Sequence, residues 1–535
     1  MHWPHHFLLY NELGLQKIKL LFLFFIFPFV VKAQTDFKQD NYILTKNLWG
    51  DSSKFETVKL YKKDSVQVRW VPFLNKLQYV QAHPYNWNDG AMVPAKGWQQ
   101  FIRAGVNAQW KFVELQIAPE MGMAQNQLFD GLPLDADEVL WRDYYRFYNF
   151  IELPERMGDN PYKKMSWGQS YLKLHYKNWQ VGVSNENKWW GPAQRNALLL
   201  SNTAAGFPHI TLGTSKPVNS KIGNFNIELI TGKLTNGGWL PPSIFMPLRG
   251  NQLFFPKENN TRIINGINIS YQPKWFSNLN IGFEQTHVQY QKDMTKWTDY
   301  IPVKNILHNI PDDGIIKPII LTALYFNYTM PEANTTIYGE VGWNLQRTSL
   351  RNWVLQPDKG YASTWGIKKI FTTTKKHYWE LLGELTQVQL LTRAEQFSTD
   401  IPTSWYLGSH VRQGYTHDGQ LLGAGVGPGG SSQTIEFNWR KNNNRIGITG
   451  ERRVHNNDYY QFAYTASGQF KQYYVDFITT LKVDWRIKKY TIGPRVSYMQ
   501  TNNYQWEWFP TKKTGWIPGR DIQQVMLQFN LQYDL

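Results

Sequence analysis

The stretch that decides the fold is the last one, residues 524–535, QVMLQFNLQYDL. Apolar and polar side chains alternate along it with a period of two, which is the pattern of a β-strand with one apolar and one polar face. Its length exceeds the roughly five or six residues usual in soluble sheets, and its faces suit lipid outside and water inside. Val525, Leu527, Phe529, Leu531, Tyr533 and Leu535 fall on the apolar face, and Gln524, Gln528, Asn530, Gln532 and Asp534 on the polar face, with Met526 as the exception.

Two hairpins repeat this pattern further up the chain. In residues 171–184, YLKLHYKNWQVGVS, the apolar phase changes from even to odd positions across Lys177-Asn178. A two-residue turn there pairs Tyr176 with Trp179 and brings every apolar side chain of both strands to one face. The same change of phase occurs across Lys488-Lys489. Short turns at one end and long Gly-, Pro- and Asn-rich connections at the other are typical of outer-membrane barrels.

Composition agrees with a large exported β-protein. The chain has 535 residues, 42% hydrophobic and 16% aromatic, so general disorder is excluded. It has no cysteine, which excludes disulfides, thiolate metal sites and a cysteine nucleophile. We therefore expect an all-β fold, a transmembrane antiparallel β-barrel of roughly 16–18 strands, with loops or a small plug blocking its lumen. A soluble β-sandwich is the alternative.

The N-terminus carries an export signal. Lys17 and Lys19 precede an apolar run, 20–31, and Ala33 supplies the small residue of a cleavage site. We expect a signal peptide over 1–33, an N-terminal periplasmic extension or plug over 34–64, and the barrel over 65–535, in the bacterial outer membrane. A short helix is expected within Asp135–Phe150, in a loop or plug.

The densest polar and aromatic stretch is residues 184–210, SNENKWWGPAQRNALLLSNTAAGFPHI, which has neither strand nor helix periodicity. Sugars are bound by aromatic faces together with amides, carboxylates and guanidinium groups. The same residues also suit a plug in which the polar groups satisfy one another, and the residue chemistry leaves both readings open. The candidate polysaccharide-binding residues here are Glu186, Asn187, Trp189, Trp190, Arg195, Asn196 and Asn202.

This block resembles the Wzi-type capsule-assembly family of outer-membrane lectins. The resemblance rests on 184–212, continues through Lys216-Pro217 and 222–234, and includes IELPERMGDNPYKKMSWGQSYLKL upstream. Residues 412–433, RQGYTHDGQLLGAGVGPGGSSQ, are similar to the longer family members of gliding and gut bacteria. Arg412, Tyr415 and His417 of this stretch form a second candidate group for polysaccharide binding.

The resemblance implies an 18-stranded barrel with a blocked lumen and a lectin-like role in assembling and attaching capsule or exopolysaccharide at the cell surface. The alternatives are a surface adhesion or gliding-motility component and a saccharide porin. We expect no enzymatic activity, no cofactor and no metal. The expected partners are capsular or exopolysaccharide, outer-membrane lipid and lipopolysaccharide, and other capsule-export or motility proteins, but no nucleic acid.

The remaining features of the sequence indicate less about function. A formal charge of +16 suits either acidic polysaccharide or the phosphates of lipopolysaccharide. A carboxylate pair of a glycosidase would need a partner for Glu186 that the sequence does not identify. His417-Asp418 and His455 with Asp458 are interpreted as solvated turns.

Overall fold

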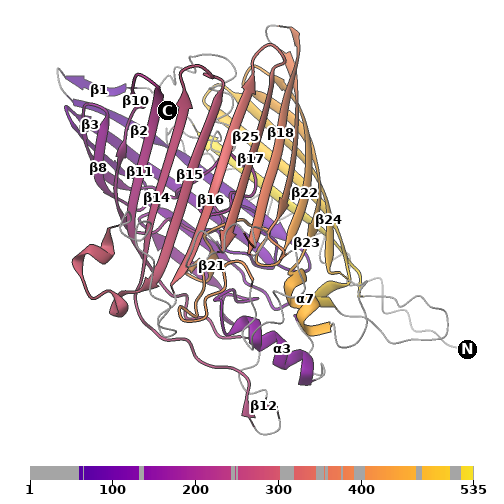
Figure 1. Ribbon diagram of the computed structural model, residues 1–535. Helices are drawn as coiled ribbons and strands as arrows, with labels where there is room; N and C mark the ends of the chain where they lie inside the picture. Colours follow the sequence, from indigo (N-terminus) through magenta and orange to yellow (C-terminus); the bar gives the residue numbers. More distant parts are fainter. Residues whose placement is uncertain are drawn as a thin grey trace, which may run out of the picture.

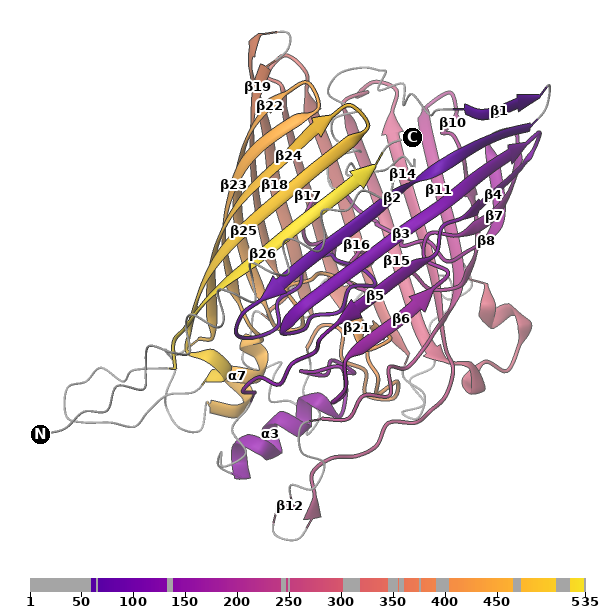
Figure 2. The same cartoon turned by 180° about the vertical axis from the view of Figure 1, so that it is seen from behind.

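The chain forms one antiparallel sheet that closes on itself (Figures 1 and 2). The structure, a computed structural model, describes residues 59–63, 66–131, 138–241, 247–248, 251–301, 318–344, 355, 360–374, 377–390, 404–464, 473–506 and 520–533. Closure joins β2 (Val66–Val80) to β26 (Ile522–Tyr533), with Phe73 opposite Tyr533 and Val80 opposite Met526. The ladder therefore leaves no open edge between the first and last strands of the wall.

The described wall has 18 antiparallel strands, which confirms the expected all-β barrel. Two of the 18 are each broken into two segments. After β2 the order is β3 (Gly97–Trp110), β4 (Val113–Ile117) with β5 (Glu120–Ala124), β6 (Tyr162–Ser166) with β7 (Tyr171–Tyr176), β8 (Trp179–Ser184), β9 (His209–Thr214), β11 (Gly223–Leu234), β14 (Arg262–Pro273), β15 (Leu279–Tyr290), β16 (Ile319–Met330), β17 (Thr335–Asn344), β18 (Tyr361–Thr374), β19 (His377–Gln387), β22 (Ser431–Lys441), β23 (Asn444–Val454), β24 (Val475–Ile487), β25 (Tyr490–Asn502) and β26.

The two faces of the wall differ as the alternation predicts. Gln524, Asn530 and Gln532 of β26 point inward and are buried, whereas Val525 between them is exposed on the outer face. An apolar outer band of this kind matches the hydrocarbon of a bilayer. Val181, Leu212, Leu324, Ile367, Ile446, Leu481, Val496, Leu527 and Phe529 all belong to this band and are 42–58% exposed.

Turn lengths distinguish the two ends of the barrel. Tyr176 lies opposite Trp179, and Ile487 opposite Tyr490, so both hairpins predicted from the sequence are confirmed. These short turns gather at the upper end in Figure 1, and the long connections lie at the other end. Because outer-membrane barrels keep short turns in the periplasm, the long-connection end faces outward from the cell.

The strand breaks in β4–β5 and β6–β7 follow from local sequence. Pro119, between β4 and β5, has no N–H to donate to the ladder. Ala118 instead forms an isolated bridge with Gly168 between β6 and β7. Glu120 and Gln169, which flank this bridge, reach into the lumen. The breaks therefore bring two polar side chains inside the wall.

Two long connections, 185–208 and 404–430, fold back into the outward-facing half of the lumen, and together they are called the plug below. Leu198, Leu199 and Leu200 pack with Trp405 and Tyr406 in one buried cluster. The cluster also contains wall residues near the outward-facing strand ends, among them Ile264, Val288 and Leu321. The plug thus has a hydrophobic core of its own, which is continuous with the wall.

Short elements complete the structure. The helix expected within Asp135–Phe150 spans Glu138–Tyr148 as α3 and lies beneath the barrel beside α7 (Figure 1). None of the helices among the described residues is long and apolar enough to cross a membrane. The expected signal peptide, 1–33, and residues 34–58 of the expected extension lie outside the described residues. The other elements are β1 (Lys59–Lys63), β10 (Val218–Asn219), β12 (Pro247–Leu248), β13 (Asn251–Gln252), η1 (Gln291–Asp293), η2 (Trp297–Tyr300), β20 (Thr416–His417), β21 (Gln420–Leu421), α7 (Asn457–Tyr464) and η4 (Tyr504–Trp506).

Candidate functional site

Wall carboxyl groups hold the backbone of the plug. Glu384 on β19 accepts hydrogen bonds from the backbone N–H groups of Gln194, Arg195 and Asn196, at N–O distances of 2.7–3.1 Å. Tyr338 donates its hydroxyl proton to the same carboxyl group at 2.8 Å. A buried N–H without a partner costs free energy, and these loop amides have no ladder to join. Glu384 therefore satisfies three of them at once.

Two further wall glutamates extend this arrangement. Glu340 on β17 accepts the backbone N–H groups of Ala193 at 2.8 Å and Leu198 at 2.9 Å. Glu228 on β11 accepts the indole N–H of Trp190 at 2.8 Å and pairs with the ammonium group of Lys188 at 2.8 Å. Residues 188–198 are therefore fixed to three separate strands, which makes this part of the plug a rigid platform.

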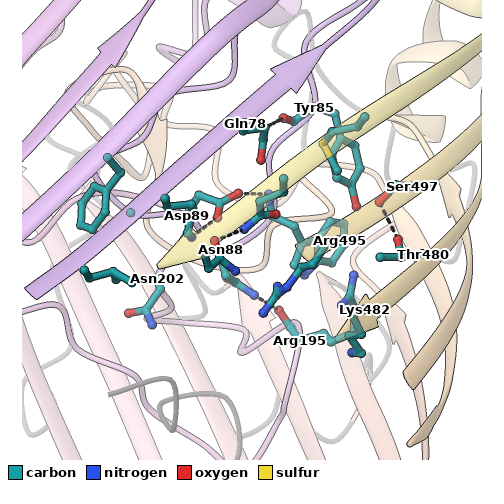
Figure 3. Close-up of a pocket in the computed structure, with 18 of the residues that line it drawn as sticks. Gln78, Tyr85, Asn88, Asp89, Arg195, Asn202, Thr480, Lys482, Arg495 and Ser497 are labelled. Atoms are coloured by element: carbon teal, nitrogen blue, oxygen red, sulfur yellow. Dashed lines mark hydrogen bonds and ion pairs between the residues drawn. The ribbon is translucent and has the colours of Figure 1, made fainter. Parts of the chain in front are cut away.

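A cavity of about 230 Å³ lies between the plug and the short-turn end, and Figure 3 shows residues of its lining. Strand residues from β2, β3, β5, β19 and β22–β26 form its sides, and residues 85–91 with parts of the plug form its floor. Asn187, Arg195 and Asn202 belong to that floor. Its charged lining consists of Lys76, Arg103, Arg195, Arg445, Lys482 and Arg495 with Asp89, Glu120 and Glu436.

Aromatic and charged groups are packed together on the cavity floor. The Arg195 guanidinium lies over the Trp87 ring, with its central carbon 4.7 Å from the ring centroid, and pairs with Glu451 at 2.5 Å. Burial disfavours the charged guanidinium, but the nearby Glu451 carboxylate outweighs it and raises the pKa of Arg195. Burial also raises the pKa of the Tyr85 phenol. The floor therefore presents a fixed cation beside neutral aromatic rings.

Several lining residues keep a buried polar atom without a hydrogen-bond partner among the described residues. They include the indole N–H of Trp87, the Oδ1 atom of Asn202 and the Nε atoms of Arg103, Arg195 and Arg495. Buried polar atoms of native proteins are nearly always satisfied by protein or by bound molecules. Their concentration around one cavity marks it as a place that would bind a polar molecule.

The candidate residues of 184–210 divide between the cavity and the packing of the plug. Asn187, Arg195 and Asn202 line the cavity, whereas Trp190 is 2% exposed and Asn196 is fully buried. Trp190 packs in the main core cluster, so neither face of its ring is open.

Two other candidates of this block bond within the protein. Trp189 donates its indole N–H to the Ala193 carbonyl at 3.0 Å and packs against a second buried cluster that contains Ala193 and Tyr338. Glu186 pairs with Lys173 at 2.6 Å. Both residues therefore support the block locally.

The second candidate group, in residues 412–417, does not lie at the cavity with the residues of 184–210. Arg412 donates to the backbone carbonyls of Asn149, Phe255 and Pro256 near the outward-facing end. Tyr415 is fully buried and donates its hydroxyl proton to Thr286 at 2.9 Å. His417 is buried as well. Tyr415 fixes the plug to the wall, Arg412 fixes it to neighbouring connections, and none of the three side chains lines the cavity.

The reading of the histidine pairs as solvated turns was wrong. His417 is 4% exposed at its side chain, lies 3.5 Å from Asp418, and has its pKa lowered to about 4 by burial. His455 pairs at 2.6 Å with Asp476 and not with Asp458, and burial lowers its pKa as well. Both stretches look like loops in sequence, but the inward-folded connections carry them into the interior. No group of three metal-ligating side chains occurs in the part of the chain that the structure describes.

Sequence reasoning missed most of the cavity. Lys482, Arg495 and Trp87 are not among the candidate residues that the sequence identifies. The available signal was the presence of full charges at inward positions, where amides predominate on β26. Which inward charges converge depends on the strand register and on closure between β2 and β26.

Comparison with known proteins agrees with the fold. Residues 105–290 match the family model of capsule assembly protein Wzi. No curated protein sequence matches the chain. Among solved structures, Wzi of Escherichia coli, described as an outer-membrane protein involved in group 1 capsule assembly and a carbohydrate-binding β-barrel, superposes with a TM-score of 0.57 at 11% identity, over 86% of this chain and 85% of Wzi.

Outer-membrane proteins of other bacteria resemble the chain more weakly. Acinetobacter baumannii OccAB2 has a TM-score of 0.40 at 10% identity, over 88% of this chain and 97% of that one. A BenF-like porin of Pseudomonas fluorescens has 0.40 at 8% identity, over 88% and 99%. Both TM-scores lie below 0.5. The family match over 105–290 and the similar fold of E. coli Wzi bear out the resemblance stated above, and the chain has the fold of an outer-membrane β-barrel.

Proposed function

We propose that this barrel is a non-enzymatic protein that binds capsular polysaccharide or exopolysaccharide and helps to assemble and attach it at the cell surface. The family match over 105–290 supports a role in capsule assembly, and the similar fold of E. coli Wzi, itself described as carbohydrate binding, supports a glycan as the ligand.

The observation that carries the proposal is the cavity beside the plug. A sugar ring presents hydroxyl groups around its edge and an apolar face, so amides, guanidinium groups and aromatic rings recognise it together. Asn187, Arg195 and Asn202 supply amide and guanidinium groups within one cavity, and Trp87 adds an indole N–H that has no partner among the described residues. The remaining candidate residues, including Trp190 and Tyr415, support the glycan site by fixing the plug.

The plug favours binding of a glycan over its passage through the barrel. An 18-stranded wall without a plug would enclose a water-filled channel. Here, wall carboxyl groups and a continuous apolar core hold residues 188–198 inside the lumen. A saccharide porin would have to release those contacts, so retention of a polymer fits the structure better than its diffusion through the barrel.

Binding and hydrolysis should be measured in one sample. Purified full-length protein is titrated with the host's own surface polysaccharide, and newly formed reducing ends are assayed in the same mixture. The proposal expects saturable binding without release of reducing ends. Absence of binding would overturn the glycan role, and release of reducing ends would overturn the non-enzymatic role.

Asn202→Ala separates ligand contact from folding. Asn202 Oδ1 has no hydrogen-bond partner among the described residues, so its loss leaves no described acceptor or donor unsatisfied. Loss of one sugar hydrogen bond of about 1 kcal/mol should weaken polysaccharide binding roughly fivefold, with an unchanged thermal midpoint. Asn219→Ala, at an exposed position of β10, is the matched control and should bind normally. Equal affinities of the two variants would place the ligand elsewhere.

A further inference from the structure

We infer that the cavity binds an acidic sugar unit, such as a uronate, and that this unit enters from the short-turn, periplasmic end of the barrel. The inference rests on the proposed function and adds to it the charge of the ligand and its direction of approach.

The balance of charge in the cavity favours an anion. Its lining holds six cationic side chains and three anionic ones. Three cations are matched within the lining, since Lys76 pairs with Asp89 at 2.6 Å, Arg103 lies 3.7 Å from Glu120, and Lys482 pairs with Glu436 at 2.5 Å. Arg195 pairs with Glu451 outside the lining, and Arg445 bonds to Asp484 outside it and lies 3.9 Å from Glu436 within it.

Arg495 has no bonded carboxylate among the described residues, although Asp484, which is bonded to Arg445, lies within electrostatic range of it. Its side chain forms no hydrogen bond or ion pair with another described residue, and its Nε atom is buried without a partner. Guanidinium groups bind carboxylates in a planar, two-pronged geometry, and such charge-assisted hydrogen bonds are stronger than neutral ones. Arg495 is therefore available to a carboxylate brought by a ligand.

Strand register places a second cation beside Arg495. Lys482 on β24 lies directly opposite Arg495 on β25, and both side chains point into the cavity (Figure 3). Like charges directly opposite each other destabilise a sheet. Glu436 offsets Lys482 but does not contact Arg495. An anionic group between the two cations would remove the repulsion that remains.

The cavity is reached from the short-turn end. On the other side, the plug and its buried cluster fill the lumen. Toward the short turns, the inward-facing residues Gln67, Arg69 and His175 are partly exposed. Because the short turns mark the periplasmic end, a glycan meets Arg495 from the periplasm.

The test compares two hexasaccharides that differ only in charge. Full-length protein in detergent is titrated with β-1,4-linked glucuronate hexamer and with cellohexaose, at low and high salt. We expect the uronate to bind at least about tenfold more tightly, with a preference that falls as salt rises, because screening weakens charge pairs. Equal affinities would overturn the inference and leave the proposed function standing. Failure of both hexasaccharides and of the host polysaccharide would overturn both.

A matched pair of variants assigns the preference to its residue. Arg495→Gln should lower uronate affinity about tenfold and leave cellohexaose affinity unchanged. Arg452→Gln on β23, two strands away from β25, removes the same charge outside the cavity and should change neither affinity. Heat-modifiable migration on gels shows that each variant retains the closed barrel. If Arg495→Gln binds the uronate as Arg452→Gln does, the assignment is wrong.

The side from which the glycan reaches the cavity is tested with the same protein. In liposomes with the barrel inserted in one orientation, the glucuronate hexamer is added to either side. Binding from the short-turn side alone is expected, and binding only from the long-connection side would overturn the inferred direction of approach.

Discussion

Replacing Glu384 with alanine should release the plug. Three backbone N–H groups, of Gln194, Arg195 and Asn196, donate to this carboxyl group in the interior. Leaving a buried donor unsatisfied costs about 1–3 kcal/mol, so three amides give a loss of about 3–9 kcal/mol in the docking of residues 188–198. A loss of about 4 kcal/mol already changes the ratio of docked to undocked plug about 1,000-fold.

Conductance across a planar bilayer reports that change, because an undocked plug opens a water-filled lumen. The wild-type protein should show little or no steady current, and Glu384→Ala should show frequent channel openings. Glu384→Gln keeps one acceptor oxygen and should fall between them. Glu332→Ala, at the exposed turn between β16 and β17, removes the same charge without touching the plug and serves as the control.

Heat-modifiable gel migration must first show that Glu384→Ala retains a closed barrel. A folded variant that conducts no more than Glu332→Ala, and whose residues 188–198 resist protease as in the wild type, would refute the reasoning. Large steady currents from the wild-type protein would refute it equally, because the plug would then not close the lumen.

Three further predictions concern the stability of the barrel and its plug. Trp190→Ala should lower the free energy of unfolding by about 3–5 kcal/mol, because this buried ring packs in the core and bonds to Glu228; an unchanged thermal midpoint would contradict this. Acid should weaken the packing of the segment after β2 against β25 and β26, because burial lowers the pKa of His83 to about 4, below its unfolded value near 6.5, so its stabilising contribution is full above pH 6.5 and is lost as pH falls toward 4. Melting at stepped pH should show this loss, and His83→Gln should flatten it; identical slopes would contradict the assignment. Deleting 524–535 should prevent stable membrane assembly, because β2 would lose its partner in lipid; a heat-modifiable, detergent-stable truncated barrel would contradict this.

The strands were predictable because their signal is local. Alternation along β26 gives the lipid face at Val525 and the lumen face at Gln524 without any knowledge of the neighbouring strands. A two-residue turn likewise determines the register between Tyr176 and Trp179. Strand number was less accessible, because β4 and β5 together form one interrupted strand of the wall and β6 and β7 form another.

The plug and the cavity were only partly predictable, because they depend on contacts between distant segments. The sequence identifies 184–210 as polar and aromatic, but the interior position of Trp190 depends on Glu228, Glu340 and Glu384, which come from three separate strands. In the sequence, these glutamates look like any other inward polar residue. Likewise, Lys482 is seen to lie opposite Arg495 only once the register of two adjacent strands is known.

The central claim, that a glycan occupies the cavity beside the plug, can be tested most directly by protecting a single thiol. The chain has no cysteine, so Asn202→Cys and, as a control, Lys221→Cys in an exposed turn each introduce one reactive site. The rate of labelling by a small thiol reagent is measured with and without saturating host polysaccharide. We predict that the polysaccharide slows labelling at position 202 at least about tenfold and leaves position 221 unchanged, since a bound sugar excludes the reagent from the cavity. Unchanged labelling at position 202, in protein that binds the polysaccharide, would contradict the claim.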